Sequence, residues 1–153
     1  MYLLNNANTL DIYLKNTGGN TAGNAINYTP DEWLHIGYSW DGTTVTWYTN
    51  GVNSGTSSLS GTLACSAGNL TFGESADGYL YYGGLMSEVR IWNIARSEVE
   101  IQADMYKELT GTEEGLVGYW KLNEGSGIIA YDSSVNDNHG TLYGDPIWFT
   151  GSG

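Results

Sequence analysis

The sequence is poor in cysteine, in basic residues and in long apolar runs. Each shortage excludes a structural feature or a class of partner. Cys65 is the only cysteine in the 153 residues, so no disulfide can form within the chain. Five Lys and Arg face seventeen Asp and Glu, and the net charge of -12 repels nucleic acid phosphates and anionic membranes. No window reaches the roughly 18 apolar residues of a membrane span, and no signal-peptide pattern opens the sequence. We therefore expect neither nucleic acid binding nor membrane insertion.

Tyrosine, tryptophan and small polar residues are abundant instead. Twelve Tyr and six Trp stand against two Phe, and only 14% of the residues are charged. Aromatic side chains with a polar edge suit half-buried sheets and binding faces. The length fits one domain of ordinary size, so we expect a single domain over residues 1–153.

A β-hairpin is the strongest local pattern. Residues 33–40 alternate between apolar and polar, Asp41-Gly42 supplies a tight turn, and residues 43–50 return in register. Asn50-Gly51 marks a second turn, and residues 16–24 are expected to form a loop. Further strand candidates are residues 10–14, 70–72, 80–82, 85–92, 116–122, 139–143 and 147–149.

Helical character is predicted once, over residues 97–109. Ser97 and Glu100 have the spacing of a capping box, in which each side chain satisfies a free backbone amide at the helix start. Ile101, Met105 and Leu109 follow at four-residue spacing and predict one apolar stripe.

Three segments in consistent order resemble the laminin-G-like, concanavalin A-like jelly-roll domains of secreted bacterial surface proteins. They are DEWLHI (31–36) through WDGTT (40–44) to YTNGV (48–52), then SEVRIWN (87–93), then GYW (118–120) to NHGTL (138–142). The resemblance covers about residues 31–149 and implies an all-β antiparallel jelly-roll sandwich in an extracellular or cell-surface protein. It also implies a domain shortened at its N-terminus, because the strands that usually precede residues 10–14 are missing.

A missing strand leaves a sheet edge uncovered, and unpaired edge groups recruit other strands. We therefore expect a homodimer that buries this edge. The alternative is a monomer in which residues 1–8 replace the absent strands.

Catalysis is not expected. The glucanases of this fold class resemble one another in a strand motif of paired carboxylates, and no such motif is present. The densest acidic region, residues 98–114, falls on the predicted helix and turn. His35 and His139, the only histidines, lie in no nucleophile context.

Two constellations are candidate sites. Asp132, Asn136 and Asn138 concentrate oxygen donors in a loop that, in related domains, lies near a bound calcium ion, and Ca²⁺ prefers oxygen ligands. The alternative is an Asx-rich turn that caps its own backbone. Aromatic platforms for stacking on a sugar are Tyr79, Tyr81 and Tyr82, together with Trp47, although Trp47 is also expected to pack in the core.

The sequence therefore predicts a non-catalytic carbohydrate-binding or adhesion module whose partner is a glycan or a surface protein. A structural or protein-interaction sandwich is the alternative, and a glycoside hydrolase is the third reading. Fold alone does not decide among them.

Overall fold

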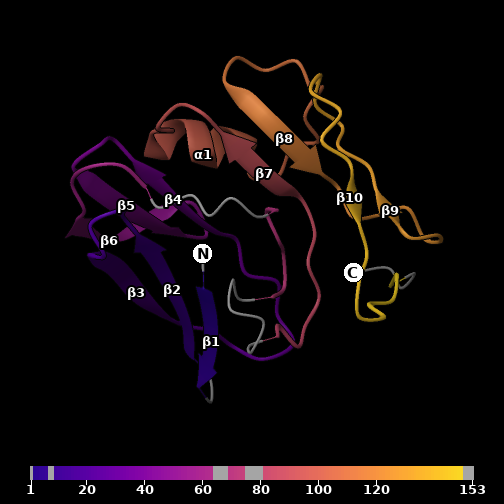
Figure 1. Ribbon diagram of the computed structural model, residues 1–153, viewed down its shortest axis with the longest axis horizontal. Coiled ribbons are helices and arrows are strands. Elements are labelled where there is room, and N and C mark those ends of the chain that lie inside the picture. Colours follow the sequence, from indigo (N-terminus) through magenta and orange to yellow (C-terminus); the bar gives the residue numbers. More distant parts are fainter. Residues whose placement is uncertain (1, 7–8, 64–68, 75–80, 150–153) are drawn as a thin grey trace. The chain divides into compact units, whose positions relative to one another are not determined.

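The structure is a computed structural model that describes residues 2–6, 9–63, 69–74 and 81–149. Within these ranges the chain forms antiparallel strands and one short helix (Figure 1), which confirms the predicted all-β fold class. No helix in the described ranges has the length and apolar character needed to cross a membrane.

The chain divides into two compact units that interleave along the sequence. Unit 1 contains residues 1–83 and 96–106, and unit 2 contains residues 84–95 and 107–153. The chain therefore passes from one unit to the other three times. The expectation of a single domain over residues 1–153 stays a prediction.

Unit 1 holds two antiparallel sheets of three strands each, in which sequence neighbours pair with one another. Hydrogen bonds join the two sheets at one side, since Asn24 Nδ2 donates to Ser54 Oγ over 3.3 Å and Ser57 Oγ donates to the Gly23 carbonyl over 3.4 Å. The first sheet consists of β1 (Tyr2–Asn6), β2 (Thr9–Lys15) and β3 (Thr21–Asn27), and the second of β4 (Ile36–Trp40), β5 (Thr44–Thr49) and β6 (Val52–Ser58).

The core of unit 1 follows from strand alternation. Every second residue of a strand points to the same face, and the registers Leu10↔Ile26 and Leu14↔Ala22 align the apolar faces of β2 and β3. Val45 and Trp47 contribute the matching face of β5. The buried cluster consists of Leu10, Ile12, Leu14, Ala22, Ile26, Val45, Trp47 and Leu59.

Both predicted turns of the hairpin are confirmed. Asp41 Oδ1 accepts hydrogen bonds from the backbone amides of Thr43 and Thr44, at 2.9 and 2.8 Å, so the side chain closes the β4–β5 turn. At the β5–β6 turn Asn50 and Gly51 have φ of 49° and 75°, which is the left-handed region that this residue pair tolerates.

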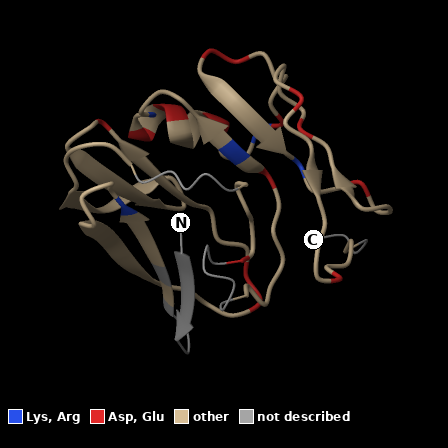
Figure 2. Ribbon diagram, in the orientation of Figure 1, with Lys and Arg blue, Asp and Glu red and all other residues tan. Residues whose placement is uncertain are grey.

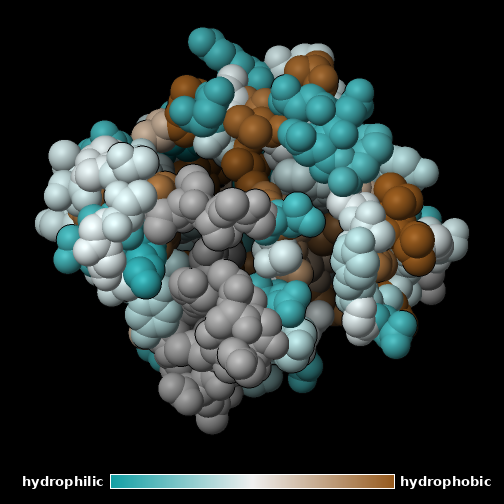
Figure 3. Space-filling view, viewed as in Figure 1, coloured by the Kyte–Doolittle hydropathy of each residue, from teal (hydrophilic) through white to brown (hydrophobic). Residues whose placement is uncertain are grey.

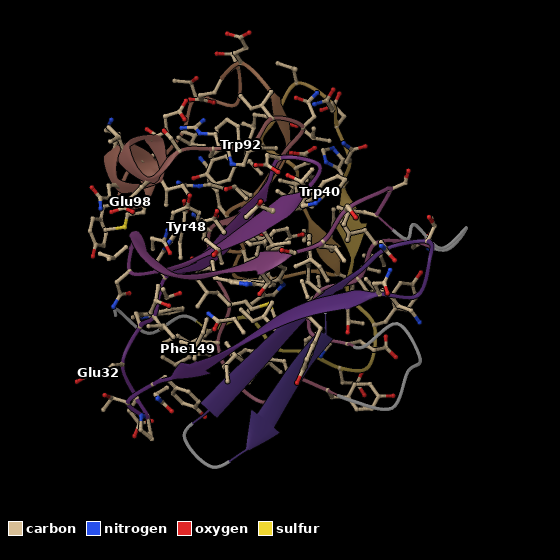
Figure 4. The ribbon with its side chains drawn as sticks, turned by 90° about the vertical axis from the view of Figure 1, so that its left-hand side faces the viewer. Glu32, Trp40, Tyr48, Trp92, Glu98 and Phe149 are labelled. Atoms are coloured by element: carbon tan, nitrogen blue, oxygen red, sulfur yellow. The ribbon has the colours of Figure 1, made fainter. Side chains whose placement is uncertain are left out.

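Helix α1 (Glu98–Asp104) belongs to unit 1 and begins with the predicted capping box. The Ser97 hydroxyl accepts from the Glu100 amide, and the Glu100 carboxylate accepts from the Ser97 amide over 2.8 Å. The helix packs at the β5–β6 turn, since Gln102 Nε2 donates to the Gly51 carbonyl over 3.1 Å. Figure 4 shows Glu98 on the helix and Tyr48 on β5.

The helix is shorter than predicted. It ends at Asp104 with Met105 as its C-cap, so Leu109 does not extend the apolar stripe of Ile101 and Met105. Leu109 lies in unit 2 instead, where it is buried against Leu116 and Tyr119. Four-residue spacing alone therefore overstated the helix by about one turn.

Unit 2 consists of two antiparallel strand pairs joined by an isolated bridge between Trp120 and Asp132. Tyr119 is fully buried at its centre, and its hydroxyl donates to Glu88 Oε2 over 2.6 Å. Burial, followed by the bond to Glu88, raises the pKa of the Tyr119 hydroxyl. The pairs are β7 (Val89–Trp92) with β8 (Leu116–Trp120), and β9 (Ile129–Ala130) with β10 (Gly140–Thr141).

Several strand predictions were wrong. The expected loop at residues 16–24 contains most of β3, while residues 70–72 and 147–149 form no strand. Strands β1 and β6 were not predicted, because their sequences carry little apolar alternation. Pairing of β1 with β2 agrees with the monomer alternative, in which the first residues replace missing strands, but the oligomeric state stays a prediction.

Candidate functional site

Exposed aromatic side chains gather in unit 1 where two short segments lie side by side. Tyr82 N–H donates to the Gly73 carbonyl over 2.8 Å, and Glu74 and Tyr81 form an antiparallel bridge. Exposed fractions are 73% for Tyr81 and 38% for both Phe72 and Tyr82. We call Phe72, Glu74, Tyr81 and Tyr82 the Tyr81 surface.

The Tyr81 surface combines two properties that suit recognition of a polar ring. Residues opposite each other in an antiparallel bridge project to the same side, so the side chains of Tyr81 and Glu74 leave the backbone on the same side. An aromatic face accepts C–H groups and a carboxylate accepts hydroxyl protons, so the pair can hold both parts of a saccharide. Phe72 and Glu74 escaped the sequence analysis because only tertiary pairing brings residues 69–74 to the Tyr pair.

The other predicted platform residues behave differently. Trp47 is 1% exposed in the core of unit 1, where its Nε1 donates to Ser57 Oγ over 3.1 Å and its ring contacts that of Tyr38. A buried indole offers no face to a ligand, which corrects the prediction of Trp47 as a platform and supports its core alternative. Tyr79 lies outside the described residues.

The predicted calcium loop is held together by the Asp132 carboxylate. Asp132 is 5% exposed, and its Oδ1 accepts from the amides of Tyr119 and Ser134, each at 2.8 Å. Its Oδ2 accepts from Ser134 Oγ at 2.8 Å and from the Asn138 amide at 2.9 Å. Burial alone would raise the pKa of Asp132, but these donors outweigh it and hold the pKa below its ordinary value.

These contacts test whether the loop residues fit a calcium ion. A carboxylate offers about four lone-pair sites, and protein donors occupy that many on Asp132. The amide nitrogens of Asn136 and Asn138 both donate to the Val117 carbonyl, at 3.1 and 3.0 Å. As arranged, the Asp132 carboxylate serves the Asx-turn alternative and has no lone pair left for a cation.

No cluster of three or more His, Cys, Asp or Glu side chains suited to a metal occurs in the described part of the chain. Calcium binding stays a prediction, which a calcium-dependent rise in melting temperature would support.

Carboxyl groups with displaced pKa values give information about catalysis. Within the described ranges, Asp41, Glu100, Glu108, Glu113 and Asp132 all have a pKa below the ordinary value. Hydrogen bonds within a turn or a helix cap, or a bond from a lysine, are what lower them. A glycosidase general acid requires the opposite displacement.

Acidic residues are distributed along the chain (Figure 2), where red ribbon segments lie on α1 and on several loops and blue segments are few. Part of the negative charge is paired locally, since Arg96 Nη2 lies 2.5 Å from Asp104 Oδ2 and Lys121 bonds Glu108. In the helix, Glu100 completes the capping box and Asp104 pairs with Arg96.

The fold and sequence together define the class of protein. The chain belongs to the concanavalin A-like lectin/glucanases superfamily, whose family model matches residues 1–102. This confirms the predicted resemblance and the concanavalin A-like sandwich. The match begins at residue 1, ahead of the segments that carried the resemblance, and ends before residues 118–142.

Among solved structures, a putative carbohydrate binding protein from Bacteroides ovatus ATCC 8483 is similar in fold. Its TM-score is 0.69 at 23% identity, over 88% of this chain and 40% of that protein. An S-layer domain-containing protein from Clostridium thermocellum ATCC 27405 matches 62% of this chain and 50% of its own, with 22% identity and a TM-score of 0.41. The chain thus spans less than half of the first protein. No curated protein matches the chain.

Proposed function

We propose that the chain is a non-catalytic carbohydrate-binding or adhesion module of a secreted or cell-surface protein, and that it binds its glycan at the Tyr81 surface. The observation that carries the proposal is the exposure of Phe72, Tyr81 and Tyr82 beside the Glu74 carboxylate. Exposed apolar side chains that gather in one patch mark a binding site more often than single scattered ones do.

The comparisons support a saccharide as the ligand class. The superfamily combines lectins and glucanases, so membership directs attention to carbohydrates without separating binding from hydrolysis. The name of the similar Bacteroides ovatus protein points the same way. A surface location agrees with this ligand, because extracellular glycans are its natural source.

The described carboxyl groups with a displaced pKa include none suited to act as the general acid of a hydrolase. The described carboxyl groups with displaced pKa values are held ionised, whereas hydrolysis requires one carboxylic acid that keeps its proton near neutral pH. The remaining alternative, a sandwich that only supports other domains or binds a protein, predicts that no glycan is bound.

A glycan microarray probed with and without calcium tests the proposal. Binding should then be measured by calorimetry with soluble probes, namely cellopentaose, xylopentaose, mannopentaose and chitopentaose. The variant Tyr81→Ala should weaken the affinity about tenfold, the size expected for one lost stacking contact.

Tyr106→Ala is the matched control, because Tyr106 is another tyrosine of unit 1 and is 84% exposed. Equal loss of affinity in both variants would contradict the assignment to the Tyr81 surface. A blank array would favour the structural alternative, and release of reducing ends from a probe would show hydrolysis.

A further inference from the structure

Unit 2 presents a second aromatic pair, formed by Tyr131 and His139. The register of β9 with β10 places these residues opposite each other, one step beyond the pair Ala130↔Gly140. Their rings meet edge to face, with centroids 5.2 Å apart and an interplanar angle of 78°. Tyr131 is 55% exposed, and His139 is exposed as well. The pair is therefore open to solvent on a hairpin of the sheet.

One hydrogen bond holds the backbone of Tyr131, and another holds the ring of His139. The Tyr131 amide donates to Glu124 Oε1 over 2.7 Å, and the Asp132 amide donates to His139 Nδ1 over 3.1 Å. Asp132 is itself the most heavily bonded carboxylate of the unit. The His139 ring, which is held by a side-chain hydrogen bond, loses little conformational freedom when a ligand binds, and this increases affinity.

The polar atoms of the pair remain unused. Because Nδ1 of His139 accepts a hydrogen bond, its neutral ring carries the proton on Nε2. Neither His139 Nε2 nor the Tyr131 hydroxyl has a hydrogen-bond partner among the described residues. The Glu124 carboxylate accepts from the Tyr131 amide through Oε1, and its Oε2 atom is buried and also has no partner in those ranges. A buried carboxylate oxygen without a hydrogen-bond donor lowers the stability of the folded state.

We propose that Tyr131 and His139 form a second binding site, in unit 2, for a neutral pyranose. The Tyr131 face packs against the C–H face of the sugar, His139 Nε2–H donates to a hydroxyl oxygen, and the Tyr131 hydroxyl donates or accepts at its rim. Figure 3 shows hydrophobic surface over the region of β9 and β10, where Ile128 is 64% exposed.

A neutral saccharide fits this set better than other aromatic-binding ligands. The net charge of -12 opposes a nucleotide or another anionic ring. A sugar supplies donors and acceptors around an apolar face. This matches the His139 Nε2–H donor and the Tyr131 hydroxyl, which donates or accepts, beside an aromatic ring. The inference rests on the proposed function for its ligand class, but it concerns other residues in the other unit.

The two histidines provide the test. His35 lies in unit 1 and His139 in unit 2, so the imidazole C–H signals of the whole chain in a ¹H–¹³C NMR spectrum include an internal control. Cellopentaose, xylopentaose, mannopentaose and chitopentaose are each added at millimolar concentration. At least one probe should shift the His139 signals and leave those of His35 in place.

Variants separate stacking from structural support. Tyr131→Ala should weaken binding at this site about tenfold, and Tyr131→Phe should retain most of it, because the ring face remains. His139→Asn keeps an acceptor for the Asp132 amide and removes the imidazole, so the fold should persist while the affinity falls. Tyr81→Ala should leave the His139 response unchanged.

The outcomes distinguish this inference from the proposed function. If a probe binds and Tyr81→Ala abolishes binding, while His139 signals stay fixed and Tyr131→Ala binds normally, the second site is overturned and the proposed function stands. If the His139 response occurs and Tyr81→Ala changes nothing, the second site is supported and the Tyr81 surface is overturned. If no probe in the panel binds, both are overturned.

Discussion

Asp132 is the residue on which the loop of unit 2 most depends. Replacing it with Asn puts an amide donor where Oδ2 accepts from Ser134 Oγ and the Asn138 amide, so two buried donors lose their partner. We expect Asp132→Asn to lower the free energy of unfolding by about 2 to 4 kcal/mol. Chemical denaturation followed by circular dichroism measures the loss.

Asp137→Asn is the control for that variant. It removes the same charge from the same loop at an exposed residue, and Asn tolerates the φ of 53° found there. Its effect should stay within about 0.5 kcal/mol. Similar losses in the two variants would mean that loop charge, and not the buried hydrogen bonds, stabilises the loop.

The lowered pKa of Asp132 makes stability depend on pH. The folded state holds this carboxyl below its unfolded pKa of about 3.9, so its contribution is complete above that value and declines as pH falls through the folded pKa. Melting temperature should therefore drop when pH is lowered from neutral to about 3, and drop less steeply in Asp132→Asn. Parallel curves for the two proteins would contradict this role.

At the scale of elements, the packing of α1 depends on the β5–β6 turn. A Cβ on Gly51 would lie 2.7 Å from Met105 Sδ, and Gly51 has a φ of 75°. Gly51→Ala should cost about 2 to 4 kcal/mol, because it strains the backbone and also displaces the helix. Thermal unfolding of the purified variants reports the difference.

A substitution at Gly42, in the β4–β5 turn, separates the cost of backbone strain from the cost of displacing the helix. Its φ is 102°, yet a Cβ there would have no atom within 4 Å, so Gly42→Ala carries the backbone strain alone. We expect a loss of about 1 to 2 kcal/mol. A Gly51→Ala variant as stable as Gly42→Ala would show that the helix yields freely at this contact.

The sequence predicts elements well where local chemistry and apolar alternation agree. The hairpin of β4 and β5 combines Val45 and Trp47 with an Asp41-Gly42 turn, and the capping box marks the start of α1. Strand β3 has only Ala22 and Ile26 buried in a run of small polar residues, so its pairing with β2 is what makes it a strand. Pairing with a neighbouring strand outweighs a weak β-strand propensity in such cases.

The candidate sites were predicted only in part, because strand pairing, which the local sequence does not determine, brings some of their residues together. Tyr81 and Tyr82 are visible as an aromatic pair in a Gly-rich stretch, but Glu74 joins them only through a bridge between segments. Asp132 was recognised as the centre of its loop, whereas its four donors come partly from β8, which the loop sequence does not contain. The sequence therefore identifies candidate site residues, whereas the residues beside them are known only once the strand pairing is known.

Oligomeric state belongs to the whole molecule and is the remaining prediction. The sequence predicts a homodimer with a monomer as the alternative, and the pairing of β1 with β2 agrees with the monomer. Sedimentation equilibrium at micromolar concentration distinguishes the two. We expect a species of twice the monomer mass, and a single species of monomer mass would remove the dimer.

The interleaving of the two units determines the order in which they can form during synthesis. Unit 1 needs residues 96–106, which leave the ribosome only after residues 84–95 of unit 2. Strand β7 therefore emerges before unit 1 is complete, and it must wait for β8 while the chain is translated at about 5 to 20 residues per second. During that interval β7 has no partner strand from its own chain, so its unpaired backbone groups can pair with another strand.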